Sequence, residues 1–276
     1  MSRTRRAAAS LSGMDWVFSV AGLLLLLFVL LPLVATIFAS TPADFAKGVA
    51  DKGVLASLWI TFAAALVATV IALVLGLPLA YLLARRDFPG KSLVQGLVDL
   101  PIIIPHTAAG VALLMVFGRR GVLGAPLASL GLYFTENFAG IVVAMLFVSL
   151  PLLVDTARET FVLVDGRLEG VARTLGAGPW SAFRRVTLPL AWRGIAAGAV
   201  LMWARGISEF GAVVMLAYNP KAISVLVYER FAGFGLSAAL PVTILLLVLA
   251  LIVLVVVRAV LAPDRKRRRA ARGGPR

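Results

Sequence analysis

The sequence predicts an all-α, polytopic membrane protein with six transmembrane helices, and three observations support this. Of the 276 residues, 61% are hydrophobic and the mean hydropathy is +0.99, whereas soluble domains hold roughly 45–50% apolar residues. The apolar residues gather in six runs, each close to the roughly 20 residues that a helix needs to cross hydrocarbon. None of the runs alternates apolar and polar residues as the strands of a membrane barrel do. Helices are expected because they satisfy every backbone N–H and C=O within the segment.

The six runs define the predicted spans. They are Val17–Phe38, Leu58–Leu83, Leu97–Phe117, Phe138–Val154, Gly194–Ala217 and Ala239–Leu261. We therefore expect a basic N-tail over residues 1–16, one transmembrane domain over 17–262 and a basic C-tail over 263–276. The third and fourth spans contain Pro101, Pro105 and Pro151, which remove helical hydrogen bonds and are expected to kink or interrupt those helices.

Three arginines precede the first run, a pattern that a secretory signal peptide shares. The run Val17–Phe38 is longer than the apolar region of a signal peptide, and no small-residue cleavage site follows it. We therefore interpret it as a retained span.

The distribution of Lys and Arg predicts the orientation. Twenty of the 27 fall in the N-tail, in the loop Arg85–Lys91, in the segment Arg158–Arg193 and from Arg258 onward; six fall in the other loops and Arg205 lies inside a span. Short cytoplasmic loops carry the positive excess, so both termini are predicted to be cytoplasmic. The basic run 265–269 directly follows a span, where contact with anionic lipid headgroups is favoured over nucleic acid.

The segment between the fourth and fifth runs is much longer than a connector requires. Within it, four apolar residues fall at i, i+3, i+4 and i+7, which predicts one face of a short helix. They are Leu168, Val171, Ala172 and Leu175. An exposed apolar face between arginines fits a protein partner, but an amphipathic helix lying on the inner leaflet would show the same pattern.

Gly176, Gly178 and Pro179 are predicted to end this helix, with Gly176 in the positive-φ conformation that favours glycine. A second short helix is predicted over Trp180–Val186, after which Leu188-Pro189 is expected to turn the chain back toward the membrane.

This segment resembles the EAA signature of binding-protein-dependent ABC importer permeases, which is Glu-Ala-Ala, three residues, Gly, nine residues, Ile-x-Leu-Pro. The matching residues are Val171-Ala172-Arg173-Thr174-Leu175-Gly176 and Val186-Thr187-Leu188-Pro189. In that family the loop docks on a cytoplasmic ATPase. The resemblance therefore implies a coupling loop over about residues 158–190 that uses Glu169, Gly170, Val171, Ala172, Arg173, Gly176, Leu188 and Pro189. Gly170 stands at the position of the motif's Glu, and Glu169 precedes it.

Two further blocks narrow the resemblance. The segments 99–110 and 204–214, with Val227-Tyr228-Glu229-Arg230-Phe231, are similar to molybdate and tungstate permeases. Sulfate permeases share a block related to Ser208-Glu209-Phe210-Gly211, so sulfate, thiosulfate or another anion is the alternative substrate. The resemblance implies the type I ABC importer permease fold and a place in the cell (inner) membrane. It also implies a homodimer with two ATPase subunits and an extracytoplasmic oxyanion-binding protein.

The ATPase subunits would bind ATP and Mg, because this chain has no Gly-x4-Gly-Lys-Ser/Thr loop. No cofactor is expected in this chain, and no metal site, since it holds one histidine and no cysteine. We interpret it as a non-catalytic membrane subunit. A secondary transporter would ordinarily show more spans or inverted repeats, and a membrane enzyme would need a richer set of titratable residues.

Four polar residues of the spans are candidates for the translocation path or for a helix interface. Arg205 and Glu209 lie four apart near the middle of the fifth predicted span, with Ser208 beside them. On a helix they share a face and can neutralise each other, either beside the path or as a purely structural pair. His106 follows Pro105, where the third helix is expected to break, and fits either a path-lining residue or a packing contact.

The predicted orientation can be tested at Ser181, because the chain contains no cysteine. We expect Ser181→Cys to react with a membrane-impermeant maleimide only after cells are opened, whereas Lys221→Cys in a predicted outer loop reacts in intact cells. Reaction of Ser181→Cys from outside intact cells would contradict the orientation.

Overall fold

The computed structural model describes residues 13–39 and 41–261, and every regular element among them is a helix. The basic tails lie largely outside these residues. The helices are α1 Gly13–Phe38, α2 Pro42–Ala50, α3 Lys52–Arg85, α4 Lys91–Ile103, α5 His106–Phe117, α6 Gly124–Ala128, α7 Phe138–Leu163, α8 Gly166–Thr174, α9 Pro179–Ala182, the π-helical turn η1 Phe183–Thr187, α10 Leu188–Ile207, α11 Gly211–Leu216, α12 Ile223–Phe234 and α13 Leu236–Leu261.

The six predicted runs each have a helical counterpart, but the third is broken. Five unbroken helices are long and apolar enough to cross a membrane: α1, α3, α7, the continuous α9–η1–α10 and α13. The sixth span exists only as the pair α4 and α5, which meet at 115°. Ile104 is extended there (φ −73°, ψ 143°), as expected of a residue before proline. Pro105 therefore interrupts the span as predicted, whereas Pro101 and Pro151 lie inside unbroken helices.

The predicted bounds of the fourth and fifth spans are wrong. α7 continues past Val154 to Leu163, which gives it 26 residues. The helix that contains the fifth span runs without a break from Pro179 to Ile207, so the expected turn at Leu188-Pro189 does not exist. The π-helical turn η1 ends at Thr187, two residues before Pro189, and such local adjustments let a helix continue through a proline.

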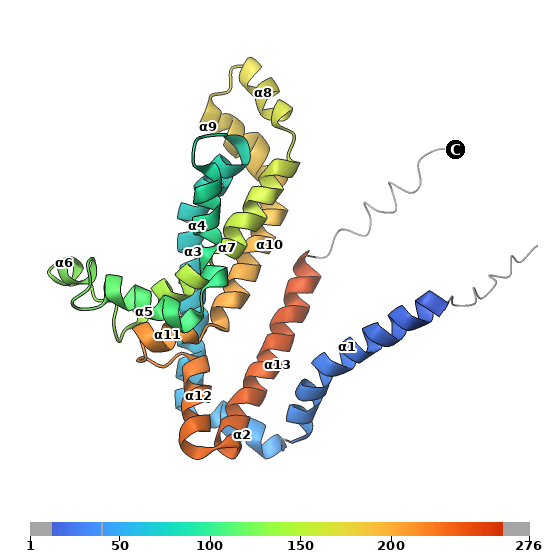
Figure 1. Cartoon of the computed structure of the whole chain (residues 1–276), viewed down its shortest axis with the longest axis vertical. Helices are drawn as coiled ribbons and strands as arrows, with labels where there is room; N and C mark the ends of the chain where they lie inside the picture. The colour runs from blue at the N-terminus through green and yellow to red at the C-terminus, as the bar shows by residue number, and fades with distance from the viewer. Residues whose placement is uncertain (1–12, 40, 262–276) are drawn as a thin grey trace, which may run out of the picture.

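The central helices α3, α7 and α10 lie side by side (Figure 1), and close approach of small residues holds them together. Ala64, Ala68 and Ala72 of α3 are buried in the core that α3 forms with α7 and α10. On α10, a Cβ added to Gly198 would lie 3.0 Å from Thr156 of α7, and one added to Gly194 would clash with Thr160. In lipid, such spacing of small residues lets helix backbones pack closely and gain dispersion energy. By contrast, α1 stands apart and has no buried residue.

The two ends of the bundle separate the polar loops into two groups (Figure 1). At the upper end, Arg85 at the end of α3 forms an ion pair with Glu169 of α8 at 3.1 Å. At the lower end, Asp51 before α3 pairs with Arg230 of α12. The loop after α3 and the segment that carries α8, both predicted to be inner, therefore lie at the same end.

Candidate functional site

The helix α8 has well-defined ends that its sequence dictates. At its start, the Asp165 carboxylate accepts a hydrogen bond from the Arg167 N–H at 2.9 Å, which satisfies a free donor of the first turn. At its end, Gly176 has φ +91° and its N–H donates to the Arg173 carbonyl at 3.0 Å. The next N–H, of Ala177, donates five residues back at 3.0 Å. This pair of bonds is a Schellman motif, so the prediction of positive φ at Gly176 is confirmed.

The predicted apolar face of α8 exists and is exposed. Val171 is 58% exposed, Leu175 is 84% exposed, and Leu168 is also exposed. Ala172 is half-buried, and α8 contains no buried residue. Such a face fits either a protein partner or the membrane surface.

Glu169 points away from this face and into the protein. Its Oε1 accepts a hydrogen bond from the Thr187 hydroxyl at 2.6 Å and one from Arg85 Nε at 3.2 Å. Its Oε2 accepts one from the Tyr81 hydroxyl at 2.8 Å. The side chains of Glu169 and Arg85 are each 16% exposed.

Burial raises the pKa of Glu169, but the hydrogen bonds from Thr187 and Tyr81 and the Arg85 charge outweigh it, so the net pKa lies below the ordinary 4.5. Because the folded-state pKa is depressed, the stabilisation is present above pH 4.5 and is lost as pH falls through the folded pKa. The contacts of Glu169 are therefore intact at neutral pH.

The other predicted residues of this segment divide between surface and interior. Gly170 and Arg173 are exposed, and Pro189 is exposed at the start of α10. Leu188 packs against the buried cluster that contains Phe161. Gly170 thus leaves α8 with no carboxylate on its outer face.

Sequence analysis missed the partners of Glu169. Tyr81 and Arg85 are 88 and 84 residues away, and Thr187 is 18 residues away. Only the position of Arg85 beside a predicted inner loop hinted that it could meet this segment.

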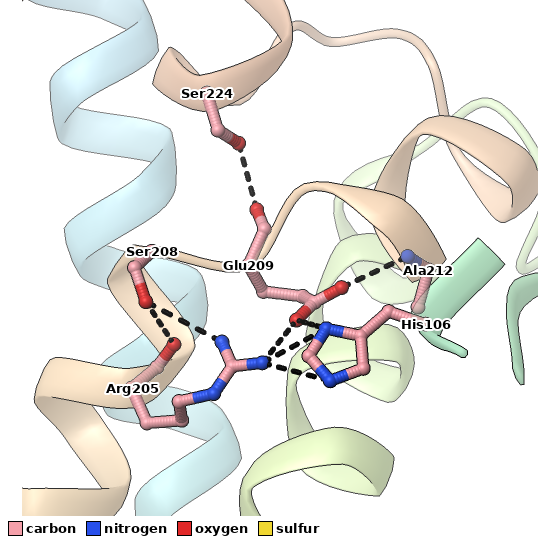
Figure 2. Close-up of polar contacts among 6 residues, drawn as sticks. All are labelled: His106, Arg205, Ser208, Glu209, Ala212 and Ser224. Atoms are coloured by element: carbon pink, nitrogen blue, oxygen red, sulfur yellow. Dashed lines mark hydrogen bonds and ion pairs between the residues drawn. The ribbon is translucent and has the colours of Figure 1, made fainter. Parts of the chain in front are cut away.

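The four polar candidates of the spans form a single cluster (Figure 2). Glu209 is fully buried, and its Oε2 lies 3.0 Å from Arg205 Nη2 and 3.1 Å from His106 Nδ1. Oε2 accepts no hydrogen bond from the described residues, so its interaction with Arg205 is that of an ion pair. Arg205 Nη2 also lies 2.9 Å from His106 Nδ1, and Arg205 Nη1 donates to the Ser208 hydroxyl at 3.3 Å. The predicted pairing of Arg205 and Glu209 is confirmed.

The place of this pair differs from the prediction. Arg205 lies in the last turn of α10, and Glu209 follows the helix end rather than standing mid-span. There the Glu209 Oε1 accepts a hydrogen bond from the Ala212 N–H at 2.9 Å, and its carbonyl accepts one from the Ser224 hydroxyl at 2.7 Å. A continuous helix was predicted because the apolar run extends past Phe210 without a proline.

The cluster therefore joins four elements at the point where two helices are broken. His106 comes from the start of α5, Arg205 from α10, Glu209 from the break before α11, and Ser224 from the start of α12. His106 and Arg205 point toward the buried carboxylate (Figure 2), yet 36% and 28% of their side chains remain exposed.

Comparison with known proteins shows similarity over most of the chain. A family model described as the binding-protein-dependent transport system inner membrane component matches residues 72–269. A molybdate/tungstate transport system permease protein of Thermococcus kodakarensis is 41% identical over 235 residues, which are 84% of this chain and 90% of that protein. A sulfate transport system permease protein of Escherichia coli is 34% identical over 220 residues, which are 78% and 79% of the two chains.

Among solved structures, one chain of a bacterial alginate ABC transporter aligns with a TM-score of 0.70 at 16% identity, over 89% of this chain and 94% of that chain. The transporter was crystallised with its alginate pentasaccharide-bound periplasmic protein. At this identity the likeness concerns the fold.

The charged cluster predicts strong coupling between Arg205 and Glu209. We expect Arg205→Ala to lower the thermal stability of the detergent-solubilised protein more than the double variant Arg205→Ala/Glu209→Gln does. The single change leaves a fully buried carboxylate without its strong cation, a loss of about 3 kcal/mol. In the double variant the neutral glutamine amide carries no charge and keeps an acceptor for the Ala212 N–H. Ser208→Ala removes only neutral hydrogen bonds of the cluster and should therefore cost less than Arg205→Ala. Additive losses in the double variant would show that the two residues act separately.

Proposed function

The chain belongs to the family of binding-protein-dependent transport system inner membrane components, with the type I ABC importer permease fold, and we propose that it imports molybdate or tungstate. We also propose that α8 couples the chain to an ATPase. The observation that supports this is that α8 is a capped helix with an exposed apolar face, within the spacing of the EAA signature. An exposed apolar face at the end of a membrane protein is explained by a partner that covers it.

The proposed substrate is inferred from the sequence identity of this chain to its relatives. The molybdate/tungstate relative shares 41% identity and the sulfate relative 34%. A sulfate, thiosulfate or other anion importer is the second candidate, because tetrahedral oxyanions share charge and shape.

The partners follow from the family and the surfaces. Two copies of this chain would enclose the path, two cytoplasmic ATPase subunits would cover the α8 faces, and an extracytoplasmic binding protein would dock at the opposite end. With α8 and both termini cytoplasmic, the chain would serve as a non-catalytic subunit in the inner membrane. ATP and Mg would be bound by the ATPase, and ATP-driven movement of α8 would open and close the path.

Uptake in reconstituted vesicles tests the substrate. We expect this chain, purified with its genomically adjacent ATPase and binding protein, to import molybdate or tungstate in an ATP-dependent manner. A tenfold excess of sulfate should not compete. Uptake of sulfate without molybdate or tungstate uptake would assign the chain to the second candidate.

The coupling assignment predicts different effects at two neighbouring glycines. Gly176 has φ +91° and Gly178 has φ −66°, and a Cβ at either meets no atom within 4 Å. Gly176→Ala should cost about 1–2 kcal/mol through its left-handed backbone alone and so weaken retention of the ATPase roughly 5–30-fold. Gly178→Ala is the matched control and should retain it.

The measurements are co-purification of the ATPase and ATP-dependent uptake, with binding-protein affinity expected to stay unchanged. Equal retention of the ATPase and equal uptake in the two alanine variants would refute the role of α8.

A further inference from the structure

Glu169 is the main polar contact between α8 and the membrane-spanning helices. Within the part of the chain that the structure describes, α8 has no buried residue, and its apolar residues Leu168 and Val171 point to solvent. Hydrophobic burial therefore does little to fix α8. Its position depends on its two chain connections and on the hydrogen bonds that Glu169 accepts.

The donors to Glu169 come from the inner ends of two spans. Tyr81 and Arg85 lie one helical turn apart at the end of α3, so their side chains emerge on the same face. Thr187 is fully buried and ends the π-helical turn that leads into α10. A single carboxylate thus connects α3, α8 and the helix that continues as α10.

An aromatic cluster lies beside this carboxylate and extends the connection. The Tyr81 ring packs edge-on against Phe161 of α7 at 5.5 Å and against Phe183 of η1 at 4.8 Å. The tyrosine that donates to Glu169 is therefore itself held by α7 and η1. A rigid base of this kind resists movement of the carboxylate relative to the three spans.

The turn η1 is the weak point that Glu169 fixes. Single π-helical turns are rare, are intrinsically less stable than α-helix and often occur at functional sites. Thr187 gives Glu169 its shortest hydrogen bond, 2.6 Å. This bond is a direct side-chain link between η1 and α8.

We propose that Glu169 is a positioning residue that makes α8 and the inner ends of α3 and α10 move as one body. Through it, a displacement of α8 by the ATPase reaches the spans instead of being absorbed by the loops around α8. This proposal rests on the proposed function. It assigns Glu169 to the interior joint and leaves the ATPase contact to the exposed apolar face.

The test compares two variants of the joint with a matched control in the complex of permease, ATPase and binding protein in vesicles. Glu169→Gln removes the charge, and Thr187→Val removes one donor with little change of shape. Glu159→Gln makes the same chemical change on an exposed α7 residue that forms no ion pair among the described residues. The readout is the number of ATP molecules hydrolysed per molybdate ion imported, together with retention of the ATPase.

We expect each variant of the joint to raise that ratio about tenfold, as loss of a charged hydrogen bond implies, while the ATPase stays bound and Glu159→Gln matches the wild type. An unchanged ratio in both Glu169→Gln and Thr187→Val would overturn the proposal. So would loss of the ATPase from Glu169→Gln but not from Thr187→Val, since the carboxylate would then contact the ATPase. If the Glu169→Gln protein does not insert into the membrane, the ratio measured for Thr187→Val alone tests the proposal. Absence of both molybdate and tungstate import by the wild type would instead refute the proposed substrate.

Discussion

In hydrocarbon no water can satisfy a free backbone group or a charge, so each must find its partner within the protein. This constraint explains why the break between α4 and α5 lies next to the break between α10 and α11. The break at Ile104–Pro105 places His106 at the start of α5, and the break after Ile207 frees Glu209. The Glu209 carboxylate then satisfies the Ala212 N–H, Arg205 balances its charge, and His106 lies beside both. The breaks stabilise each other, and α5 and α11 leave the direction of the bundle together (Figure 1).

At the end of the bundle that carries α8, which we propose to be cytoplasmic, polar and apolar contacts are arranged in the opposite way. With water available there, the contacts of α8 with the spans are polar and partly buried, while its apolar residues Leu168 and Val171 are exposed. A helix held this way has a fixed orientation through directional bonds and keeps its apolar area for a partner. The left-handed Gly176 fixes the angle at which the chain leaves α8 toward η1. Glu169 thus holds α8 in place against the spans, while the exposed apolar residues of the same helix remain available to a partner.

Features that depend on local sequence were predictable, and those that depend on distant contacts were not. The lengths of the apolar runs predicted the spans, Pro105 predicted the break, and the four-residue spacing predicted the pair Arg205–Glu209. His106 joins this pair across 99 residues of chain, and no periodicity indicates such a contact. The turn η1 was missed because Pro189 was expected to end a helix, whereas a shift of the hydrogen bonds by one residue lets the helix continue.

The rigid link between α8 and the spans can be measured directly, because the chain has no native cysteine. Spin labels on Arg173→Cys of α8 and Leu82→Cys of α3, both exposed positions, report the distance within one copy. Labels on Arg173→Cys alone report the distance between the two copies of a dimer. On ATP binding to the assembled transporter we expect the distance between the two copies to shift, while the α8-to-α3 distance stays narrow and unshifted. A shift or broadening of the α8-to-α3 distance as large as that between the copies would show that α8 moves independently of the spans.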